Sequence, residues 1–141
     1  MRFMVIVKAT AESEREVVPE DQEAMAAMGR FNEELVKAGV MLAGEGLHPS
    51  SKGVRLSFGA GGKRTVVDGP FAETKELVAG FWILQTKTRE ECIEWMKRAP
   101  FVDGEIEIRQ VHEAEDFAAS DPSGKLREQE QRLRDSVASR S

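Results

Sequence analysis

Apolar residues occupy both alternating sets of positions in two segments, residues 2–9 (RFMVIVKA) and 78–86 (VAGFWILQT). Successive side chains of a strand point to opposite faces, so a segment that is apolar in both sets is typical of a central strand with both faces covered. We therefore predict two central strands here and expect them to pair with each other.

Two other segments repeat apolar residues with helical spacing. Residues 19–38 place one stripe on one helix face, and Gly39 follows where a left-handed C-cap is favoured. The stripe consists of Ala24, Met28, Phe31, Leu35 and Ala38. A second helix is predicted to begin at Thr88, which has Glu91 three residues on, as in a capping box. That helix must end near residue 99, because Pro100 follows.

Shorter alternating patterns predict the remaining strands. Residues 40–49 (VMLAGEGLHP) form one of them, and residues 105–111 (EIEIRQV) form the last. Between these two, residues 54–58 and 63–67 flank a glycine-rich turn at 59–62. This pattern is typical of a β-hairpin with one buried face.

The predicted elements follow one another as strand, helix, strand, hairpin, strand, helix, strand. This order predicts an α+β fold of the ferredoxin-like βαββαβ type with an inserted β-hairpin. Helices in such a fold cover one face of the sheet, yet the central strands are apolar on the second face as well. We therefore expect a homodimer whose sheets pack face to face and enclose ligand cavities.

The charge balance narrows the range of partners. With 20 basic and 25 acidic residues the chain has a net charge of −5, and no basic cluster contains interleaved aromatic residues. Direct nucleic-acid binding is therefore not expected. No segment resembles a signal peptide or a membrane span, and the single cysteine, Cys92, cannot form an internal disulfide. We expect a cytoplasmic protein that binds small molecules or proteins.

The composition changes after His112. Residues 113–141 are polar and rich in helix formers. Almost the only large apolar residues in this segment are Leu126, Leu133 and Val137. We predict a partly helical C-terminal tail that is distinct from a domain formed by residues 1–112. Either the tail is a solvated helix, or its narrow apolar stripe docks on a protein partner or on the other subunit.

The strongest candidate for chemistry is Asp68, at the end of the second hairpin strand. The permissive Gly69 and the φ-restricted Pro70 follow it and would hold the carboxylate in one orientation, as a general base requires. Alternatively, an Asp before Gly-Pro caps its own turn through its side chain and has no chemical role.

Two neighbouring groups could complete a site around Asp68. Phe71, Glu73 and Lys75 come just after the turn, and Lys75 could hold a substrate carboxylate or phosphate, although such charges also form weak surface ion pairs. Glu45 lies between two glycines that suggest a bulge or a close backbone approach. His48 could act as an acid or base, although a lone histidine at a strand end is commonly just exposed. The two histidines of the chain show no paired ligand spacing, so neither a metal nor a cofactor is expected.

The segments GEGLHP, VDGPFAETKE, GFWIL and EIEIRQV resemble, in this order and spacing, the YCII-related proteins of the DGPF-motif branch. The resemblance covers residues 1–112 and implies a dimeric α/β-barrel-like assembly with an active-site pocket. Better-known short relatives carry a histidine on the first helix, proposed to work with an acid. The first predicted helix of this chain contains no histidine, so that mechanism is not carried over.

Two functional hypotheses result. The first is a small-molecule-binding homodimer that performs cofactor-free acid–base chemistry of an isomerase or lyase type, with Asp68 as the base and Lys75 as the anion holder. Its further substrate-binding candidates are Glu45, His48, Phe71 and Glu73. The second is a non-catalytic ligand-binding or regulatory protein, which the association of the resembled family with alternative sigma factors suggests.

Overall fold

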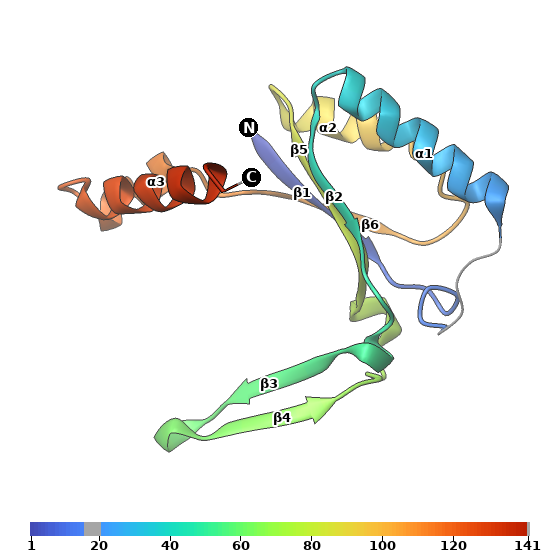
Figure 1. The fold of residues 1–141 in the computed structure, drawn as a ribbon, viewed down its shortest axis with the longest axis horizontal. Coiled ribbons are helices and arrows are strands. Elements are labelled where there is room, and N and C mark those ends of the chain that lie inside the picture. Colours follow the sequence, from blue (N-terminus) through green and yellow to red (C-terminus); the bar gives the residue numbers. More distant parts are fainter. Residues whose placement is uncertain (16–20, 141) are drawn as a thin grey trace. The chain divides into compact units, whose positions relative to one another are not determined.

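In a computed structural model that describes residues 1–15 and 21–140, the chain forms two compact units, Met1–Gln110 and Val111–Ser141 (Figure 1). The predicted start of the first helix, residue 19, lies outside the described residues.

The first unit is built on a four-stranded sheet with the order β2-β5-β1-β6, in which every neighbouring pair is antiparallel. The strands are β1 (Arg2–Lys8), β2 (Met41–Gly46), β5 (Val78–Gln85) and β6 (Ile106–Gln110). The helices α1 (Gln22–Lys37) and α2 (Arg89–Met96) cover one face of this sheet (Figure 1). This α+β arrangement is consistent with the predicted ferredoxin-like plan, and β1 and β5 pair at its centre as expected.

The core lies between this sheet face and the two helices. Trp82 packs edge-on against Phe31 of α1, with ring centroids 6.0 Å apart, and its indole N–H donates a hydrogen bond of 2.9 Å to Asn32. The other buried side chains of the cluster are Phe3, Val5, Leu35, Val40, Leu84, Cys92 and Met96. They come from positions of alternating or helical spacing, which explains why these segments form these elements.

The helix ends follow the capping signals of the sequence. Asp21 caps α1 by accepting a hydrogen bond of 3.0 Å from the backbone N–H of Ala24, and Gly39 after the helix has a φ of 71°. The hydroxyl of Thr88 accepts a hydrogen bond of 3.1 Å from the backbone N–H of Glu91 at the start of α2. α2 itself ends at Met96, a little before the predicted position.

The second face of the sheet carries a row of four side chains that crosses all four strands. Register pairs Glu45 with Phe81, Phe81 with Ile6, and Ile6 with Glu107, so two apolar residues lie between two acids. The flanking pair of Met4 and Ile83 extends the apolar centre. We call these six residues the open sheet face, because α1 and α2 lie on the opposite side of the sheet.

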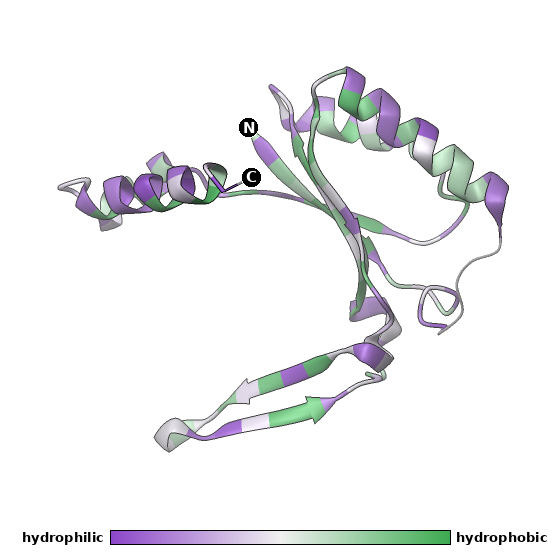
Figure 2. Ribbon diagram, viewed as in Figure 1, coloured by the Kyte–Doolittle hydropathy of each residue, from purple (hydrophilic) through white to green (hydrophobic). Residues whose placement is uncertain are grey.

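The strands β3 (Val54–Phe58) and β4 (Arg64–Asp68) form a separate two-stranded antiparallel sheet, here called the ribbon. The expectation that one of its faces is buried is wrong for the single chain, because every residue of both strands is exposed. The alternation identified the strands but could not reveal that no other described element of the first unit covers them. Figure 2 shows apolar stretches on both strands.

The second unit contains a 3₁₀ segment (Ala114–Ser120) and the helix α3 (Lys125–Ala138). Asp121 is buried between them and accepts hydrogen bonds from the backbone N–H groups of Leu126 and Arg127. The pKa of Asp121 is lowered below its usual value, mainly by the hydrogen bond from the backbone N–H of Arg127 and further by the one from Leu126. Across the part of the chain that the structure describes, no helix is long and apolar enough to cross a membrane.

Candidate functional site

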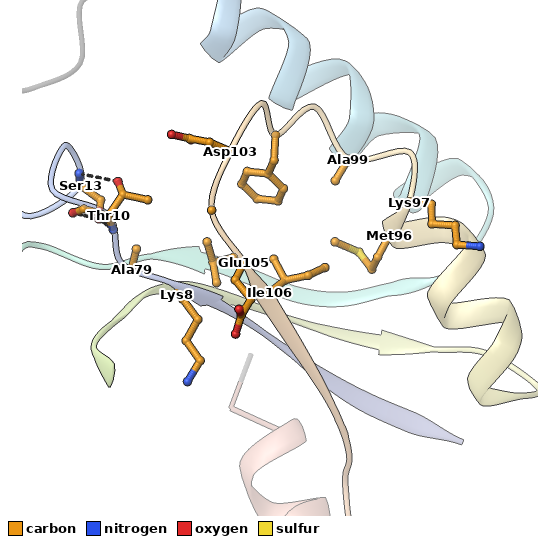
Figure 3. A pocket seen from close by; sticks show the side chains of 13 residues that line it. Lys8, Thr10, Ser13, Ala79, Met96, Lys97, Ala99, Asp103, Glu105 and Ile106 are labelled. Carbon is orange, nitrogen blue, oxygen red and sulfur yellow. Dashed lines mark hydrogen bonds between the residues drawn. The ribbon is translucent and has the colours of Figure 1, made fainter. Parts of the chain in front are cut away.

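A cavity of about 370 Å³ lies at the end of β1, beside the loop that joins α2 to β6 (Figure 3). Its floor is apolar and comes from four elements and the loop between α2 and β6, with Val7, Ala79, Met96, Phe101 and Ile106 among the lining residues. The polar groups at its rim are those of Thr10, Ser13 and Asp103, whereas Lys8 and Glu105 line it from positions in and next to the strands whose side chains alternate toward the other face of the sheet, as Figure 3 shows for Lys8. An apolar floor with a few polar groups at the rim is typical of a site for a small organic molecule.

The rim is held in shape by a short turn after β1. The backbone N–H of Thr10 donates a hydrogen bond of 2.8 Å to the Ser13 hydroxyl, and the backbone N–H of Ser13 donates one of 3.1 Å to the Thr10 hydroxyl (Figure 3). The Lys8 ammonium lies 3.5 Å from the carboxylate of Glu107. The rim therefore presents hydroxyl groups whose positions are set by local hydrogen bonds.

A second cavity, of about 240 Å³, shares Val7, Ala79 and Phe101 with the first. Glu45 lines it together with Asn32 and Trp82. The close approach predicted at the two glycines is present at Gly44, where a Cβ would lie 2.9 Å from the Trp82 ring, and absent at Gly46, where a Cβ would have no atom within 4 Å. Glu45 therefore borders a ligand-sized space next to the principal cavity.

A third hollow, of about 710 Å³, is lined by Lys75, Thr74 and Glu76 on one side and by Glu105 and Glu107 on the other. Acidic and basic groups are mixed along its walls. Lys75 is thus placed near a concave surface, but not in the lining of the apolar cavity.

The turn after Asp68 is fixed to the body of the domain through Ser50. The backbone N–H of Phe71 donates a hydrogen bond of 3.1 Å to the Ser50 hydroxyl, which in turn donates to the carboxylate of Glu14. Glu14 also accepts a hydrogen bond of 2.9 Å from the backbone N–H of Ser50. Gly69 packs so closely here that a Cβ on it would lie 1.7 Å from the Ser50 carbonyl oxygen. Only glycine fits this position without a shift of the backbone.

Asp68 itself is exposed at the end of β4, paired in register with Val54. Its carboxylate makes no hydrogen bond or ion pair with any other residue in the described ranges, so the turn is held by Ser50 and Gly53 and not by the Asp68 side chain. Asp68 does not line any of the three cavities above. Within one chain the structure therefore does not bring Asp68 together with Glu45 or Lys75.

The remaining candidate residues lie around the same turn. The Phe71 ring is half-buried and contacts the guanidinium of Arg55, 3.9 Å from its centroid. His48 and Glu73 are exposed and are not among the lining residues of the three cavities. Phe71 thus belongs to the anchored base of the ribbon, whereas His48 and Glu73 are surface positions in the single chain.

Sequence reasoning missed the residues that shape this region, Thr10, Ser13, Glu14, Ser50 and Asp103. Four of them lie in turns or loops and Ser50 begins a short 3₁₀ helix, and no hydrophobic period marks any of these segments. The Thr10-x-x-Ser13 spacing was the one local signal, because hydroxyl residues at this separation commonly bond to each other's backbone.

Neither a metal centre nor an activated thiol is found in the described ranges. No group of three or more His, Cys, Asp or Glu side chains there could hold a metal ion. Burial raises the pKa of the Cys92 thiol above its usual value, which keeps the thiol protonated at neutral pH. Cys92 is therefore a core residue of α2.

The chain belongs to the family defined by the YCII-related domain, which matches residues 1–115. An uncharacterised protein of Rhizobium meliloti (strain 1021), R00369, is 31% identical over 78 residues, or 55% of this chain. The match spans 62% of the length of that relative.

A likeness also exists to a solved structure, that of 5-chloro-2-hydroxyhydroquinone dehydrochlorinase (TftG) from Burkholderia phenoliruptrix AC1100 in complex with 2,5-dihydroxybenzoquinone. It covers 82% of this chain and 98% of that chain, with 17% identity and a TM-score of 0.40. Neither the sequence identity nor the TM-score is high enough to infer that the two proteins share an activity.

Proposed function

We propose that this protein binds a small organic molecule in the cavity bordered by Thr10, Ser13 and Asp103. The observation that carries the proposal is the cavity itself, which combines an apolar floor, hydrogen-bonding groups at the rim and a volume of about 370 Å³. The ligand that fits has an apolar ring or chain and one hydrogen-bonding end. Membership of the YCII-related family is compatible with this role.

The protein acts, in this proposal, as a homodimer. The support is the open sheet face, whose centre of Met4, Ile6, Phe81 and Ile83 is not covered by α1 or α2. Two copies that pack through this face would bury the apolar centre of each. Sedimentation of the protein as a monomer at micromolar concentration would contradict this part of the proposal.

Acid–base catalysis with Asp68 as the base, of an isomerase or lyase type, is the enzymatic form of the proposal. Asp68 has no competing ion pair among the described residues, and the anchored turn behind it limits its movement. Lys75 would hold an anionic group of the substrate, and Glu45, His48, Phe71 and Glu73 would contribute to the surrounding surface. No cofactor takes part in this scheme.

Ligand binding and turnover are tested separately. A panel of small organic acids, phenols and lactones is screened by NMR against the wild type, and hits are retested with Ala79→Leu, which fills both neighbouring cavities, and with Asp103→Asn. Glu90→Gln, on the exposed surface of α2, is the matched control for loss of a charge. We expect the two cavity variants to weaken binding at least tenfold while the control binds normally. Hits that bind all four proteins equally would refute the cavity as the site.

Asp68→Asn then separates the enzyme from a binding protein, because it keeps the shape of the side chain and removes the charge. An enzyme should retain ligand binding and lose turnover, whereas unchanged turnover would exclude Asp68 as the base. A non-catalytic regulatory role is the second candidate. Its support is the separate unit of residues 111–141, on which Leu126, Leu133 and Val137 are exposed as an apolar stripe of α3. Deletion of this unit should then abolish partner binding and leave ligand binding intact.

A further inference from the structure

One face of the ribbon carries four exposed apolar side chains and one charged residue near each end. Register places Val54, Leu56, Phe58 and Val66 on this face, with 57%, 52%, 70% and 61% of their surfaces exposed. Arg64 and Asp68 lie on the same face, opposite Phe58 and Val54 respectively. These six residues are called the apolar ribbon face.

Such a ribbon is not expected to stay uncovered in water. A single two-stranded sheet is marginally stable by itself and needs another layer to pack against. A contiguous exposed apolar surface of this kind commonly marks an interaction site. The base of the ribbon is nevertheless firmly anchored through Ser50, Glu14 and Gly69. The ribbon is therefore an arm anchored at its base, and no described residue of the first unit covers its apolar ribbon face.

The charge of the ribbon identifies what would cover it. Residues 50–68 contain Lys52, Arg55, Lys63 and Arg64 and one acidic residue, Asp68, a net charge of +3. Since the whole chain has a net charge of −5, the remaining residues sum to −8. Two ribbons facing each other would bring like charges together, whereas a ribbon on the body of a second copy would meet opposite charge.

The open sheet face offers a matching surface at its borders. Its cross-strand row ends on Glu45 at the β2 edge and on Glu107 at the β6 edge, with Phe81 and Ile6 between them. Figure 1 shows α1 and α2 on one side of the sheet and the ribbon extending toward the other side. A second copy that packs on the open sheet face therefore meets the ribbon as well.

We propose that the ribbon is an arm that packs onto the second copy of this chain, with the apolar ribbon face against an edge strand of that copy's sheet. The centre of the open sheet face is occupied by the other sheet, so the arm reaches the border where Glu45 or Glu107 ends the row. Arg64 then lies near one of these acids. The inference rests on the homodimer of the proposed function and adds the contact that completes it.

The arm also determines where Asp68 acts. Asp68 lies on the apolar ribbon face and is exposed in the single chain, so a copy that covers this face encloses the carboxylate at the boundary between the two chains. Any acid–base site that uses Asp68 is then shared, with the base from one copy and the opposing wall from the other. A site of this kind is incomplete in the monomer.

Two adjacent valines provide a matched test of the arm. Val66 lies on the apolar ribbon face, whereas Val67 lies on the opposite face beside Arg55 and is 48% exposed. Each dimer contains two arms, so Val66→Ser should raise the dimer dissociation constant about 10- to 30-fold in sedimentation equilibrium, and Val67→Ser should change it less than about threefold. The double variant Leu56→Ser with Phe58→Ser should raise it by at least about 100-fold. Equal effects of the two valine variants would overturn the proposal.

Crosslinking locates the contact without relying on the stability of variants. Benzoylphenylalanine in place of Phe58 is photolysed in a mixture of isotopically light and heavy copies, and the crosslinked peptides are sequenced. Mixed light–heavy crosslinks from the ribbon to β2 or β6 are expected. Crosslinks within one copy only, crosslinks between two ribbons, or none between copies would each overturn the proposal.

Failure of the proposed ribbon contact can be distinguished from failure of the proposed ligand-binding function. If the ribbon crosslinks between copies but no compound of the ligand panel binds, the arm stands and the ligand site fails. If compounds bind in the cavity but no ribbon contact between copies is found, the binding function stands and the arm fails.

Discussion

Replacing Ser50 with alanine removes the hydroxyl that joins the turn after Asp68 to the body of the domain. That oxygen accepts a hydrogen bond from Phe71 and donates one to the carboxylate of Glu14. A hydrogen bond to a charged group contributes about 1.5–3 kcal/mol and a neutral one about 0.5–1.5 kcal/mol. Because the groups are only half-buried, water replaces part of each contact, and we expect a loss of about 2–3 kcal/mol in the free energy of unfolding.

Ser51 provides the matched control for this substitution. Its hydroxyl is buried but has no hydrogen-bond partner among the residues that the structure describes. An unsatisfied buried hydroxyl contributes no hydrogen-bond energy and carries a desolvation cost of about 1–3 kcal/mol, so Ser51→Ala should leave the free energy of unfolding unchanged or raise it.

Urea denaturation followed by tryptophan fluorescence measures both variants, and amide hydrogen exchange at Phe71 reports on the turn itself. Ser50→Ala should lower the denaturation midpoint and accelerate exchange of the Phe71 amide hydrogen, because that amide loses its acceptor. Equal losses in Ser50→Ala and Ser51→Ala, or unchanged exchange at Phe71, would refute the role assigned to Ser50.

Three further outcomes are expected. Gly29 lies within α1 with no atom near the position of an added Cβ, so Gly29→Ala should raise the free energy of unfolding by about 0.5–1 kcal/mol in urea denaturation. Leu35→Ala should lower it by about 2–5 kcal/mol, whereas Val36→Ala, at a position 60% exposed, should lower it by less than about 0.5 kcal/mol; similar losses would contradict the assigned core face. The pKa of Asp121 is lowered, so the carboxylate stabilises α3 fully above the ordinary pKa of 3.8, and this stabilisation is lost as the pH falls through the lowered pKa. The NMR chemical shifts of α3 should therefore change only in strong acid. The variant Asp121→Asn should remove this change.

The stretch around Asp68 shows where local reasoning succeeds and where it stops. The end of a strand at Asp68 followed from the alternation of residues 63–67, and a turn followed from Gly69 and Pro70. The partner that fixes this turn is Ser50, which donates to Glu14 across 36 positions of the chain. No local pattern records such a contact, because the distance between segments far apart in sequence is set only when the sheet brings them together.

The ribbon illustrates the same division with a different physical cause. Alternating apolar residues predicted its two strands, since the period of two is a property of the local backbone. The same alternation predicted a buried face, and this was wrong for the single chain, because burial depends on what another element, or another chain, places against that face.

The sequence by itself predicted the helices and strands of an α+β fold and the pairing of β1 with β5, because the periods of 2 and 3.6 residues and the capping residues act over a few neighbouring positions. Only the tertiary structure decided which residues share a space. Val7, Ala79, Met96 and Ile106 line one cavity although they come from four segments, and Asp68 lies outside it although it was the foremost candidate for chemistry. The physical reason is that a site requires residues to be close in three dimensions. Residues far apart in the sequence become close only when the sheet packs against its helices.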